Sequence, residues 1–488
     1  MRRTNRIKLL PVLAVLLAGP SIAKAQITQP LQTPVHFNAD GETQPETQVG
    51  NYLQAAPETP DCSHLNFGPH LTQAPDSVLG QYVYVFNIHV VPDNDRCSAT
   101  DRQRLEIKSE LHSNPTPYQS YILGHLGETV IHRWRFMLPT GFQPSNSFTH
   151  IHQIKADDGD DSDPIMTLTP RFGSPDTVQL LLITSTLANP PHQTITLTQV
   201  PMAPFVGQWV EAYEVITYNF TSEEGAASPG QYSLVINRLS DNATLLSYSN
   251  NDIDMWRVGT TVVRPKWGIY RSLVNAQQLR DEQPRFNNFC MAKPPDACPS
   301  DTTLPDFSLT SAQTSITVAP GGSNPVSLTV APLNGFAQNV LLSLTGSNAV
   351  PGSTGVPAAT NLTGLPAAST ASFSPSTVTG GSGSSTLTIA TSPATPPGNY
   401  TLIINGLSAD DVRSHVVSLP LVVSGTPGDV NGDGVVNCAD LAAVRAAYGS
   451  TVGQARYNPG ADFNGDGFVN VLDLQFVVQQ LPSGTSCQ

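Results

Sequence analysis

Short runs in which apolar and polar residues alternate dominate the chain between about residue 61 and residue 298. Alternation over short runs bounded by Gly, Pro, Asn or Asp is the pattern of a β-strand with one buried face. The clearest runs are 82–91, 130–138, 177–184 and 232–238. We predict one large all-β domain over residues 61–303, preceded by a flexible segment at 26–60 whose polar, proline-bearing sequence has no sustained periodicity.

Residues 304–425 continue the alternation with far fewer charges. Asp306, Asp410, Asp411 and Arg413 are the charged residues there, and Thr, Ser, Val and Leu dominate. The alternating runs are 315–318, 326–330, 340–344, 385–389, 400–404 and 415–423. Several short strands in a segment of this length predict an immunoglobulin-like (Ig-like) sandwich, which we interpret as a spacer or a weak glycan-binding domain.

The first 25 residues are predicted to be a signal peptide. Arg2, Arg3, Arg6 and Lys8 precede an apolar stretch from Leu9 to Ala18, and small residues follow at Ala23 and Ala25. The apolar stretch is shorter than the ~20 residues that a membrane helix needs, and no later segment reaches that length. We therefore expect a secreted protein, extracellular or periplasmic, with no membrane association.

Charge and cysteine content narrow the class of protein further. The formal charge is −14, from 24 Lys+Arg against 38 Asp+Glu, and no basic run is present. This balance argues against a nucleic-acid partner, because phosphates need clustered cations. Six cysteines follow the signal peptide, and an even number in an oxidising compartment favours disulfides. By proximity we expect the pairs Cys62–Cys97, Cys290–Cys298 and Cys438–Cys487, although sequence alone does not choose among the possible pairings.

The C-terminal segment, 426–488, contains a repeated cation-binding pattern. Oxygen-bearing side chains occupy loop positions 1, 3, 5, 9 and 12 in two copies, with Gly434 and Gly467 at position 6. This EF-hand-like spacing wraps Ca²⁺, which takes six to eight oxygen ligands and needs a sharp turn at position 6. The predicted calcium ligands are Asp429, Asn431, Asp433, Asn437 and Asp440 in the first loop, and Asp462, Asn464, Asp466, Asn470 and Asp473 in the second.

Each loop is followed by an apolar helical pattern, at 441–448 and 474–478. A single helix after each loop, with Asp at position 12, resembles the type I dockerin, a calcium-dependent module that docks onto a cohesin. The resemblance covers about 428–481 and implies Ca²⁺ as cofactor and a cohesin-like protein as partner. The sequence departs from cellulosomal dockerins at the loop ends, where Cys438-Ala439 and Val471-Leu472 stand in place of a Ser-Thr-like pair.

Three segments of the large β domain place polar residues on one strand face at period two. They are Arg104-Leu-Glu106-Ile-Lys108, His150-Ile-His152 and Lys266-Trp-Gly268-Ile-Tyr270. We expect them to form one polar sheet surface, with Ile151 pointing into the core.

A loop with five aspartates, 157–163, follows the histidine strand. Ca²⁺ could neutralise these carboxylates, but a solvated acidic loop explains the pattern equally well, so both explanations stay open.

The three polar strand segments resemble the active-site strands of jelly-roll polysaccharide lyases, such as alginate lyases and glucuronan lyases. Arg104 and Glu106 match Arg-x-Glu, His152 matches the histidine of Gln-Ile-His, and Lys266, Gly268 and Tyr270 match Lys-x-Gly-x-Tyr. His150 replaces the glutamine, and Arg264-Pro265 replaces a leading Tyr-Phe. The resemblance spans about 80–290. It implies a mainly β fold: a concanavalin-like jelly roll, then the Ig-like sandwich, then a small α-helical dockerin-like domain.

The resemblance implies β-elimination on an acidic, uronic-acid-containing polysaccharide. The proton alpha to the sugar carboxylate becomes acidic when cations or hydrogen-bond donors neutralise that carboxylate, a role for Arg104, His150 and Gln153. A base then takes the proton, and an acid protonates the leaving oxygen. Free tyrosine has a pKa of about 10, and nearby cations favour its phenolate. Either His152 is the base and Tyr270 the acid, or Tyr270 serves both roles, with Lys266 and Arg104 supplying the nearby positive charge.

Two other functions compete with the lyase. A non-catalytic glycan-binding protein would use the same sheet surface without making product, and a purely structural surface protein would do neither. A glycoside hydrolase needs two carboxylates flanking the scissile bond. Glu211 and Glu214 are three residues apart, so on a strand they would point to opposite faces. We rank the hydrolase below the lyase for that reason.

Overall fold

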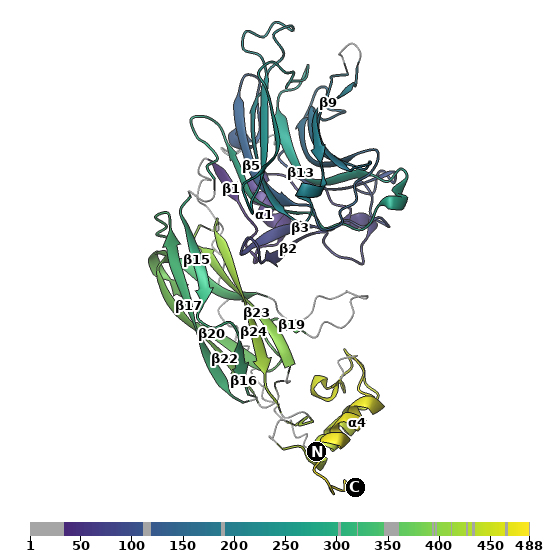
Figure 1. The fold of residues 1–488 in the computed structure, drawn as a ribbon, viewed down its shortest axis with the longest axis vertical. Helices are drawn as coiled ribbons and strands as arrows, with labels where there is room; N and C mark the ends of the chain where they lie inside the picture. The colour runs from purple at the N-terminus through teal and green to yellow at the C-terminus, as the bar shows by residue number, and fades with distance from the viewer. Residues whose placement is uncertain are drawn as a thin grey trace, which may run out of the picture. The chain divides into compact units, whose positions relative to one another are not determined.

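The structure is a computed structural model, and strands predominate in it. It describes residues 34–110, 119–186, 191–300, 304–319, 321–345, 361–392, 395, 398–410, 412–425, 428–431, 435–463 and 467–487. The predicted signal peptide lies outside these ranges. Among the described helices, none has the length and apolar character needed to cross a bilayer. The chain is mainly β, with a small helical region at its C-terminus (Figure 1).

The N-terminal β region consists of two antiparallel sheets. The first has the order β12-β11-β10-β5-β14-β3-β2, with β1 paired to β14, and the second has the order β4-β13-β6-β7-β8-β9. The strands of the first sheet are β1 (Val35–Phe37), β2 (Leu71–Asp76), β3 (Gln81–Phe86), β5 (Thr129–Met137), β10 (Trp209–Thr217), β11 (Gln231–Arg238), β12 (Thr244–Asn250) and β14 (Arg285–Ala292). Those of the second are β4 (Arg102–Lys108), β6 (Thr149–Ala156), β7 (Met166–Arg171), β8 (Thr177–Ile183), β9 (Thr194–Pro201) and β13 (Val263–Ser272).

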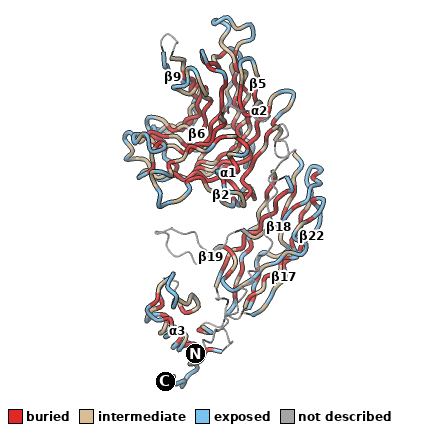
Figure 2. Tube along the Cα trace, turned by 180° about the vertical axis from the view of Figure 1, so that it is seen from behind, coloured by how far each residue is buried: buried red, intermediate tan, exposed pale blue. Residues whose placement is uncertain are grey.

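The core of this region lies between the two sheets, where buried residues follow the strands (Figure 2). Trp267 on β13 packs against Phe289 on β14, with ring centroids 5.2 Å apart, and Trp134 on β5 lies 5.9 Å from Trp267. Burial of such large apolar side chains is the main force that holds two sheets face to face. The strands predicted at 130–138, 177–184 and 232–238 are confirmed, and the one at 82–91 ends earlier, at Phe86. The jelly-roll connectivity itself stays a prediction.

The expectation of a flexible segment at 26–60 is wrong from residue 34 onward. Strand β1 pairs with β14, and helix α1 (Pro45–Leu53) follows it. Val35 and Phe37 are fully buried, and the ring of Phe37 stacks on Phe289 at 4.6 Å. The apolar residues that drive this packing are too few to give a periodic signal, so their burial depends on partners distant in sequence.

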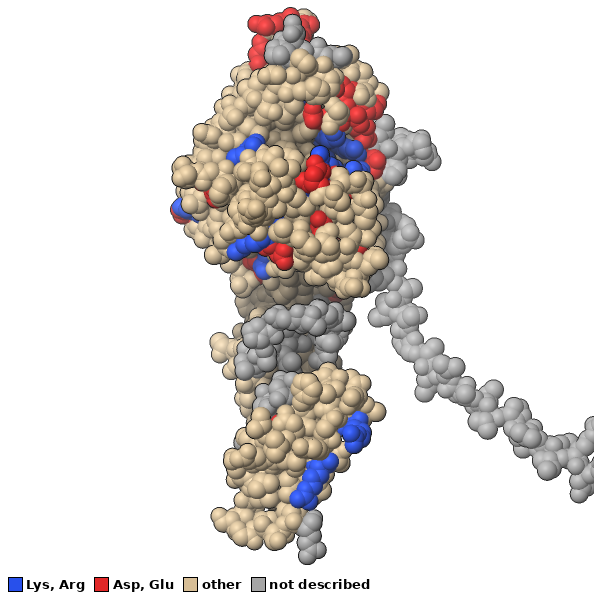
Figure 3. Space-filling model, turned by 90° about the vertical axis from the view of Figure 1, so that its right-hand side faces the viewer, with Lys and Arg blue, Asp and Glu red and all other residues tan. Residues whose placement is uncertain are grey.

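Charged side chains are sparse on the face of this region drawn at the top of Figure 3. Lys and Arg gather there in small groups close to Asp and Glu, and much of the surface carries neither.

Short helical turns connect several strands: α2 (Gln119–Ile122), η1 (Asp61–Ser63), η2 (Ala203–Phe205) and η3 (Ala276–Gln278).

Residues 304–425 also form two sheets, with the orders β15-β17-β22-β20 and β16-β24-β23-β18-β21, and β19 paired to β23. Their shared core is apolar and includes Phe307, Val326, Leu387 and Leu402. The Ig-like assignment stays a prediction. The strands are β15 (Asp306–Ser311), β16 (Ile316–Val318), β17 (Ser323–Leu333), β18 (Val340–Thr345), β19 (Asn361–Thr363), β20 (Ser369–Ser374), β21 (Thr377–Val378), β22 (Gly383–Thr391), β23 (Gly398–Ser408) and β24 (Ser414–Val423), with η5 at Thr379–Gly381.

The C-terminal region contains the two predicted helices, α3 (Cys438–Ala447) and α4 (Val471–Gln480), with η6 (Pro459–Ala461) between them. Each begins with an Asn–Asp capping box, in which Asn437 pairs with Asp440 and Asn470 with Asp473. Val444 and Val477 are fully buried in a small apolar core.

All three expected disulfides are confirmed: Cys62–Cys97, Cys290–Cys298 and Cys438–Cys487.

Candidate functional site

A polar face is built on the three neighbouring strands β4, β13 and β6. Tyr270 on β13 is paired in register with Arg104 on β4, and Lys266 with Lys108. Gly268, between Tyr270 and Lys266, has φ +143°, and a Cβ there would lie 2.2 Å from the carbonyl oxygen of Leu105. The close approach of β4 to β13 therefore requires glycine at this position.

Two arginines surround the side chain of Tyr270. The guanidinium carbon of Arg104 lies 3.8 Å from the centre of the Tyr270 ring, and Arg102 donates a hydrogen bond from Nη1 to the hydroxyl oxygen at 3.2 Å. The ring of His150, from β6, is 6.0 Å from the tyrosine ring. The hydroxyl and the ring of Tyr270 thus contact one guanidinium each, and both guanidiniums also pair with carboxylates, Arg102 with Asp101 and Arg104 with Glu58.

A network of ion pairs holds the neighbouring groups in place. Lys266 Nζ binds Glu106 at 2.8 Å and also binds Glu58, while Arg104 donates to Glu58 at 2.9 Å. Gln153 donates a hydrogen bond to Glu106. Burial by itself would raise the pKa of the Glu58 carboxyl, but Lys266, Arg104 and Lys108 together hold that pKa well below its usual range. Glu58 is therefore ionised across the neutral range.

His150 is held as a neutral imidazole on this face. Burial, with the positive charges of Arg171 and Arg104 nearby, lowers the pKa of His150 to about 3. Its Nδ1 lies 2.8 Å from Thr169 Oγ1, which leaves Nε2 as the nitrogen that can meet a ligand. Neutral imidazole donates or accepts one hydrogen bond at each nitrogen, so it can bind a carboxylate oxygen without carrying charge.

The depressed pKa of His150 predicts how the folded state responds to acid. Between pH ~6.5, the value in an unfolded chain, and the folded value of about 3, the unfolded state binds more protons at this residue. The contribution of His150 to the free energy of unfolding therefore falls as the pH falls through that window. We expect the His150→Gln variant to lose less stability than wild type between pH 6.5 and pH 4, measured by urea denaturation at each pH; equal losses in the two proteins would contradict the prediction.

His152 does not share the polar face with His150 and Tyr270, contrary to the expectation of one surface, and its catalytic role stays a prediction. The pairing of β13 with β6 shifts register between Trp267, opposite His152, and Tyr270, opposite His150. Period two is not kept along β6 at this shift: His150 and Gln153, three residues apart, both contact side chains of the polar face, while His152 does not. His152 is buried between the sheets, where Nε2 lies 3.2 Å from Glu214 on β10 and Nδ1 2.9 Å from the carbonyl oxygen of Lys266.

The other predicted residues, Arg104, Glu106, His150, Gln153, Lys266 and Tyr270, are brought together on the polar face. Their contacts with one another and with Glu58 link all three strands. Glu58 and Arg102 are two site residues that the sequence analysis missed. Arg102 continues the period-two series of Arg104 and Glu106, so the series itself could have identified it. Glu58 reaches the site because its backbone pairs with that of Glu106, and no local pattern signals such a contact.

Glu214 and its partners form a buried polar cluster between the sheets. The carboxylate accepts a hydrogen bond from the Tyr232 hydroxyl at 2.6 Å and lies 2.8 Å from His132 Nδ1, besides its contact with His152. Glu211, three residues earlier, pairs instead with Arg133 and Arg135 on the outer face of the same sheet. The two glutamates thus point to opposite faces, as expected, and cannot act as a hydrolase pair.

Glu214→Leu is expected to destabilise the N-terminal region by about 3 kcal/mol, because it leaves two histidines and one hydroxyl buried without their shared acceptor. The measurement is the urea midpoint followed by tryptophan fluorescence, since all four tryptophans lie in this region. Glu211→Gln on the same strand is the matched control and should cost less than about 1 kcal/mol. Similar midpoint shifts in the two variants would show that the buried cluster contributes no special stability.

The aspartates of the 157–163 loop turn to separate partners. Asp158 accepts hydrogen bonds from Thr260 and Thr261, Asp160 binds Ser185 and Thr186, and Asp157 pairs with Arg264. Within the described part of the chain, these carboxylates do not form a cluster of converging ligand atoms. The structure therefore favours an internally hydrogen-bonded loop over the calcium site that the sequence left open.

The described residues of the two C-terminal loops include both predicted position-12 aspartates and the position-6 glycine of the second loop. Asp440 and Asp473, at position 12, are buried, and each accepts hydrogen bonds from backbone N–H groups at its own loop's start and helix cap. Gly467 at position 6 has φ +83°, the left-handed conformation that the sharp turn needs. Of the other predicted ligands, Asp433, Asn464 and Asp466 lie outside the described residues.

One atom of the second loop tests whether these residues fit calcium. Asp462, at position 1, uses Oδ2 to accept hydrogen bonds from the Tyr457 hydroxyl at 2.7 Å and from Gly467 N at 2.9 Å. Its Oδ1 is buried and has no hydrogen-bond partner. A buried carboxylate oxygen without a donor is costly unless a cation occupies that side, so the loop fits a bound Ca²⁺.

Comparison with solved structures gives distant likenesses to parts of the chain. The chain resembles the alginate lyase vAL-1 from Chlorella virus at 10% identity, over 51% of this chain and 96% of that one, with a TM-score of 0.33. It resembles domains 4 and 5 of the S-layer protein SbsC at 14% identity, over 43% of this chain and 89% of that one, with a TM-score of 0.16. TM-scores this low do not establish a shared fold. No curated protein matches the chain by sequence.

The C-terminal region gives a specific match. Residues 427–482 match the family model described as the dockerin type I domain. The match spans both loops and both helices, α3 and α4, and agrees with the capping geometry and the unpartnered oxygen of Asp462. Residues 427–482 are therefore a dockerin type I domain.

Proposed function

We propose that the chain is a secreted polysaccharide lyase whose N-terminal β region cleaves a uronic-acid-containing glycan by β-elimination. The observation that carries the proposal is the placement of Tyr270. Its hydroxyl is 3.2 Å from Arg102 Nη1, its ring lies under Arg104, and the neutral ring of His150 is beside it. A phenol among cations, next to an uncharged hydrogen-bonding imidazole, suits proton abstraction beside a carboxylate.

The reaction needs three functions from this face. Arg102 and the Nε2 of His150 hold the sugar carboxylate, so that negative charge can develop on it. The Tyr270 phenolate takes the proton from carbon 5, and the electron pair of that C–H bond forms the double bond between carbons 4 and 5. The C4–O bond breaks, and the proton now on Tyr270 passes to the leaving oxygen. Tyr270 thus serves as base and then as acid, and the phenolate is restored at the end of the cycle.

Glu58, Glu106 and Lys266 act as positioning residues in this proposal. Their ion pairs hold Arg104 over the Tyr270 ring and keep Gln153 on the same face. Buried and mutually paired charges are well suited to fixing a single geometry, although they contribute little net stability. These ion pairs thereby hold the side chains of the polar face in position before substrate binds.

Two cations on the adjoining strands, Lys155 and Arg171, form no ion pair with a carboxylate among the described residues, and they favour an acidic polymer as substrate. Lys155 on β6 binds the carbonyl oxygens of Asp161 and Ser162, and Arg171 on β7 binds that of Asn146, so both cations are held by neutral groups. Burial and the charge of Lys266 lower the pKa of Lys155 to about 8, so it is mostly protonated at pH 7. These cations lie along the sheet from Tyr270, where neighbouring sugar units of a polyanion would lie.

The dockerin type I domain implies that the enzyme works attached to a larger assembly. We propose a cohesin-like partner and calcium in both loops. Cys438 and Leu472 occupy loop-end positions and differ from the usual hydroxyl residues. We expect this partner to differ in its contact surface from cellulosomal cohesins, because the residues that meet it differ in polarity.

The test is a screen of alginate, glucuronan, pectin and heparin-like glycans for products that absorb in the ultraviolet, the signature of an unsaturated uronate. Release of such products from one of these polymers supports the lyase. Depletion of a polymer from solution without product would instead favour the non-catalytic glycan-binding protein. Neither binding nor product would leave a structural surface protein as the better account.

A further inference from the structure

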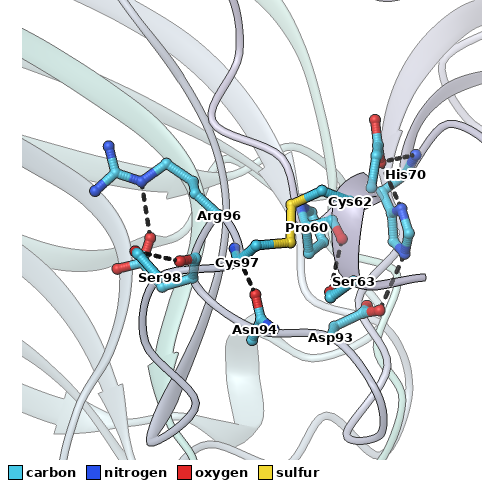
Figure 4. Close-up of a disulfide and its surroundings, with 11 residues drawn as sticks. Pro60, Cys62, Ser63, His70, Asp93, Asn94, Arg96, Cys97 and Ser98 are labelled. Atoms are coloured by element: carbon cyan, nitrogen blue, oxygen red, sulfur yellow. Dashed lines mark hydrogen bonds and ion pairs between the residues drawn. A yellow bond between two sulfur atoms is a disulfide. The ribbon is translucent and has the colours of Figure 1, made fainter. Parts of the chain in front are cut away.

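Three histidines and one aspartate converge beside the Cys62–Cys97 disulfide. Asp93 Oδ1 lies 3.1 Å from His64 Nδ1 and 3.1 Å from His70 Nε2, and Asp93 Oδ2 lies 3.0 Å from His89 Nδ1. One ligand atom from each of the four residues lies within 4.8 Å of the other three. Figure 4 shows His70 and Asp93 facing one another close to the disulfide. Among the described residues, no other group of His, Cys, Asp or Glu converges in this way.

The donor set is that of a transition-metal site. Three imidazole nitrogens and one carboxylate oxygen suit Zn²⁺, which is usually four-coordinate and tetrahedral in structural sites. With bonds of ~2.0–2.1 Å, tetrahedral zinc ligands lie about 3.3 Å apart. The three distances to Asp93, 3.0–3.1 Å, are already close to this value. Two of these distances run to Oδ1 and one to Oδ2, and all four ligand atoms lie within 4.8 Å of one another, so a bound ion would draw the side chains closer together.

The residues around the cluster also have the arrangement of a metal site. Asp61 Oδ1 lies 2.5 Å from His70 Nδ1 and accepts a hydrogen bond from the His70 backbone N–H at 3.0 Å. A carboxylate on the outer nitrogen of a histidine is the usual way in which a metal ligand is oriented. The Phe67 ring covers one side, 4.8 Å from the His70 ring and 4.3 Å from the His89 ring. The side chains of His70 and Asp93 are fully buried.

Without a metal ion, the two ring contacts of His70 require it to be a positively charged imidazolium. Each of its ring nitrogens faces a carboxylate oxygen, Nδ1 toward Asp61 and Nε2 toward Asp93. Asp93 must also serve two further rings, those of His64 and His89. A carboxylate accepts but does not donate, so every one of these nitrogens needs a hydrogen. A divalent cation at the centre satisfies Nε2 of His70, the nitrogens of His64 and His89, and the carboxylate with one atom.

We propose that His64, His70, His89 and Asp93 bind one Zn²⁺ ion as a closed structural site. The proposal does not depend on the lyase reaction. The ion and the Cys62–Cys97 disulfide together join two loops that also carry residues of the polar face. Glu58 precedes the first loop and pairs with Lys266, and Asp95 in the second lies 3.1 Å from Arg104 Nε. Zinc thus fixes the segments that deliver these two carboxylates to Arg104 and Lys266.

The experiment measures zinc binding to the full, untagged chain. Metal is removed with a chelator, excess Ca²⁺ is restored to fill the dockerin loops, and Zn²⁺ is titrated calorimetrically, with metal content checked by elemental analysis. We expect one tightly bound zinc per chain. Co²⁺ added instead should give the intense visible absorption of a tetrahedral site, which carboxylate-rich calcium loops do not give. Absence of a tight zinc site in wild type would overturn the proposal without bearing on the lyase assay.

Two variants locate the ion. His64→Gln removes a ligand whose side chain is 24% exposed, so the fold should tolerate it, and we expect at least a tenfold loss of zinc affinity. Asp61→Asn alters the residue behind His70 and should weaken binding by about 10–100-fold. His192→Gln changes an exposed histidine outside the cluster and should leave affinity unchanged. Equal affinity in wild type and His64→Gln would place the zinc elsewhere and overturn the assignment.

Discussion

Tyr270→Phe is expected to lower the rate of unsaturated uronate release by about 10²–10⁴-fold, the range for loss of a general acid–base group. The change removes one oxygen atom, the one that lies 3.2 Å from Arg102 Nη1. The ring stays under Arg104, so the packing of β13 against β4 is retained. Substrate binding depends on Arg102 and His150 and should persist, so KM should change much less than kcat.

Tyr213→Phe is the matched control. Tyr213 also lies under an arginine, with the guanidinium carbon of Arg133 4.7 Å from the ring centre, but it is on β10 in the opposite sheet. This variant should keep wild-type activity. Circular dichroism and the urea midpoint of both variants should match wild type. A Tyr270→Phe protein that cleaves as fast as wild type would show that the hydroxyl takes no part in proton transfer.

The polar face shows what local sequence can and cannot reveal about such a site. Period-two patterns placed Arg104, Glu106, Lys266 and Tyr270 correctly, because an unbroken strand exposes alternate residues on one side. The same reasoning failed for His152, since the register shift on β13 is set by pairing between strands that are about 110 residues apart. His150, which was matched to a glutamine in the resemblance, is the histidine on the face.

Other features were missed because their partners are distant in the sequence. Phe37 is buried only when β1 meets β14, and Glu58 reaches Lys266 through a backbone pairing with Glu106. The spacing of His64, His70 and His89 matches no common metal motif, so the cluster appears when two loops are joined by a disulfide. The dockerin loops, by contrast, carry their ligands within twelve consecutive residues, and so the sequence alone identified them.

Selective chelation of Ca²⁺ from the full chain is expected to remove most of the protection of residues 435–487 against amide hydrogen exchange. Clustered carboxylates such as Asp462 and Asp473 repel one another until a cation neutralises them, so loop folding and binding are coupled. At a free Ca²⁺ concentration 100 times Kd, binding stabilises the domain by about 2.7 kcal/mol. The Cys438–Cys487 disulfide limits expansion of the calcium-free state, so exchange rates are a better measure than complete unfolding.

A chelator selective for calcium leaves the proposed zinc site filled, so the exchange of residues 34–300 should not change. Asp462→Ala removes the carboxylate whose Oδ1 is buried without a partner. It should reproduce the loss of protection around α4 at a calcium concentration that still protects α3, because the first loop keeps its ligands. Asp410→Asn, in an exposed turn outside both loops, is the control. Protection of residues 435–487 that is the same with and without calcium would show that packing of α3 against α4, rather than metal binding, folds this domain.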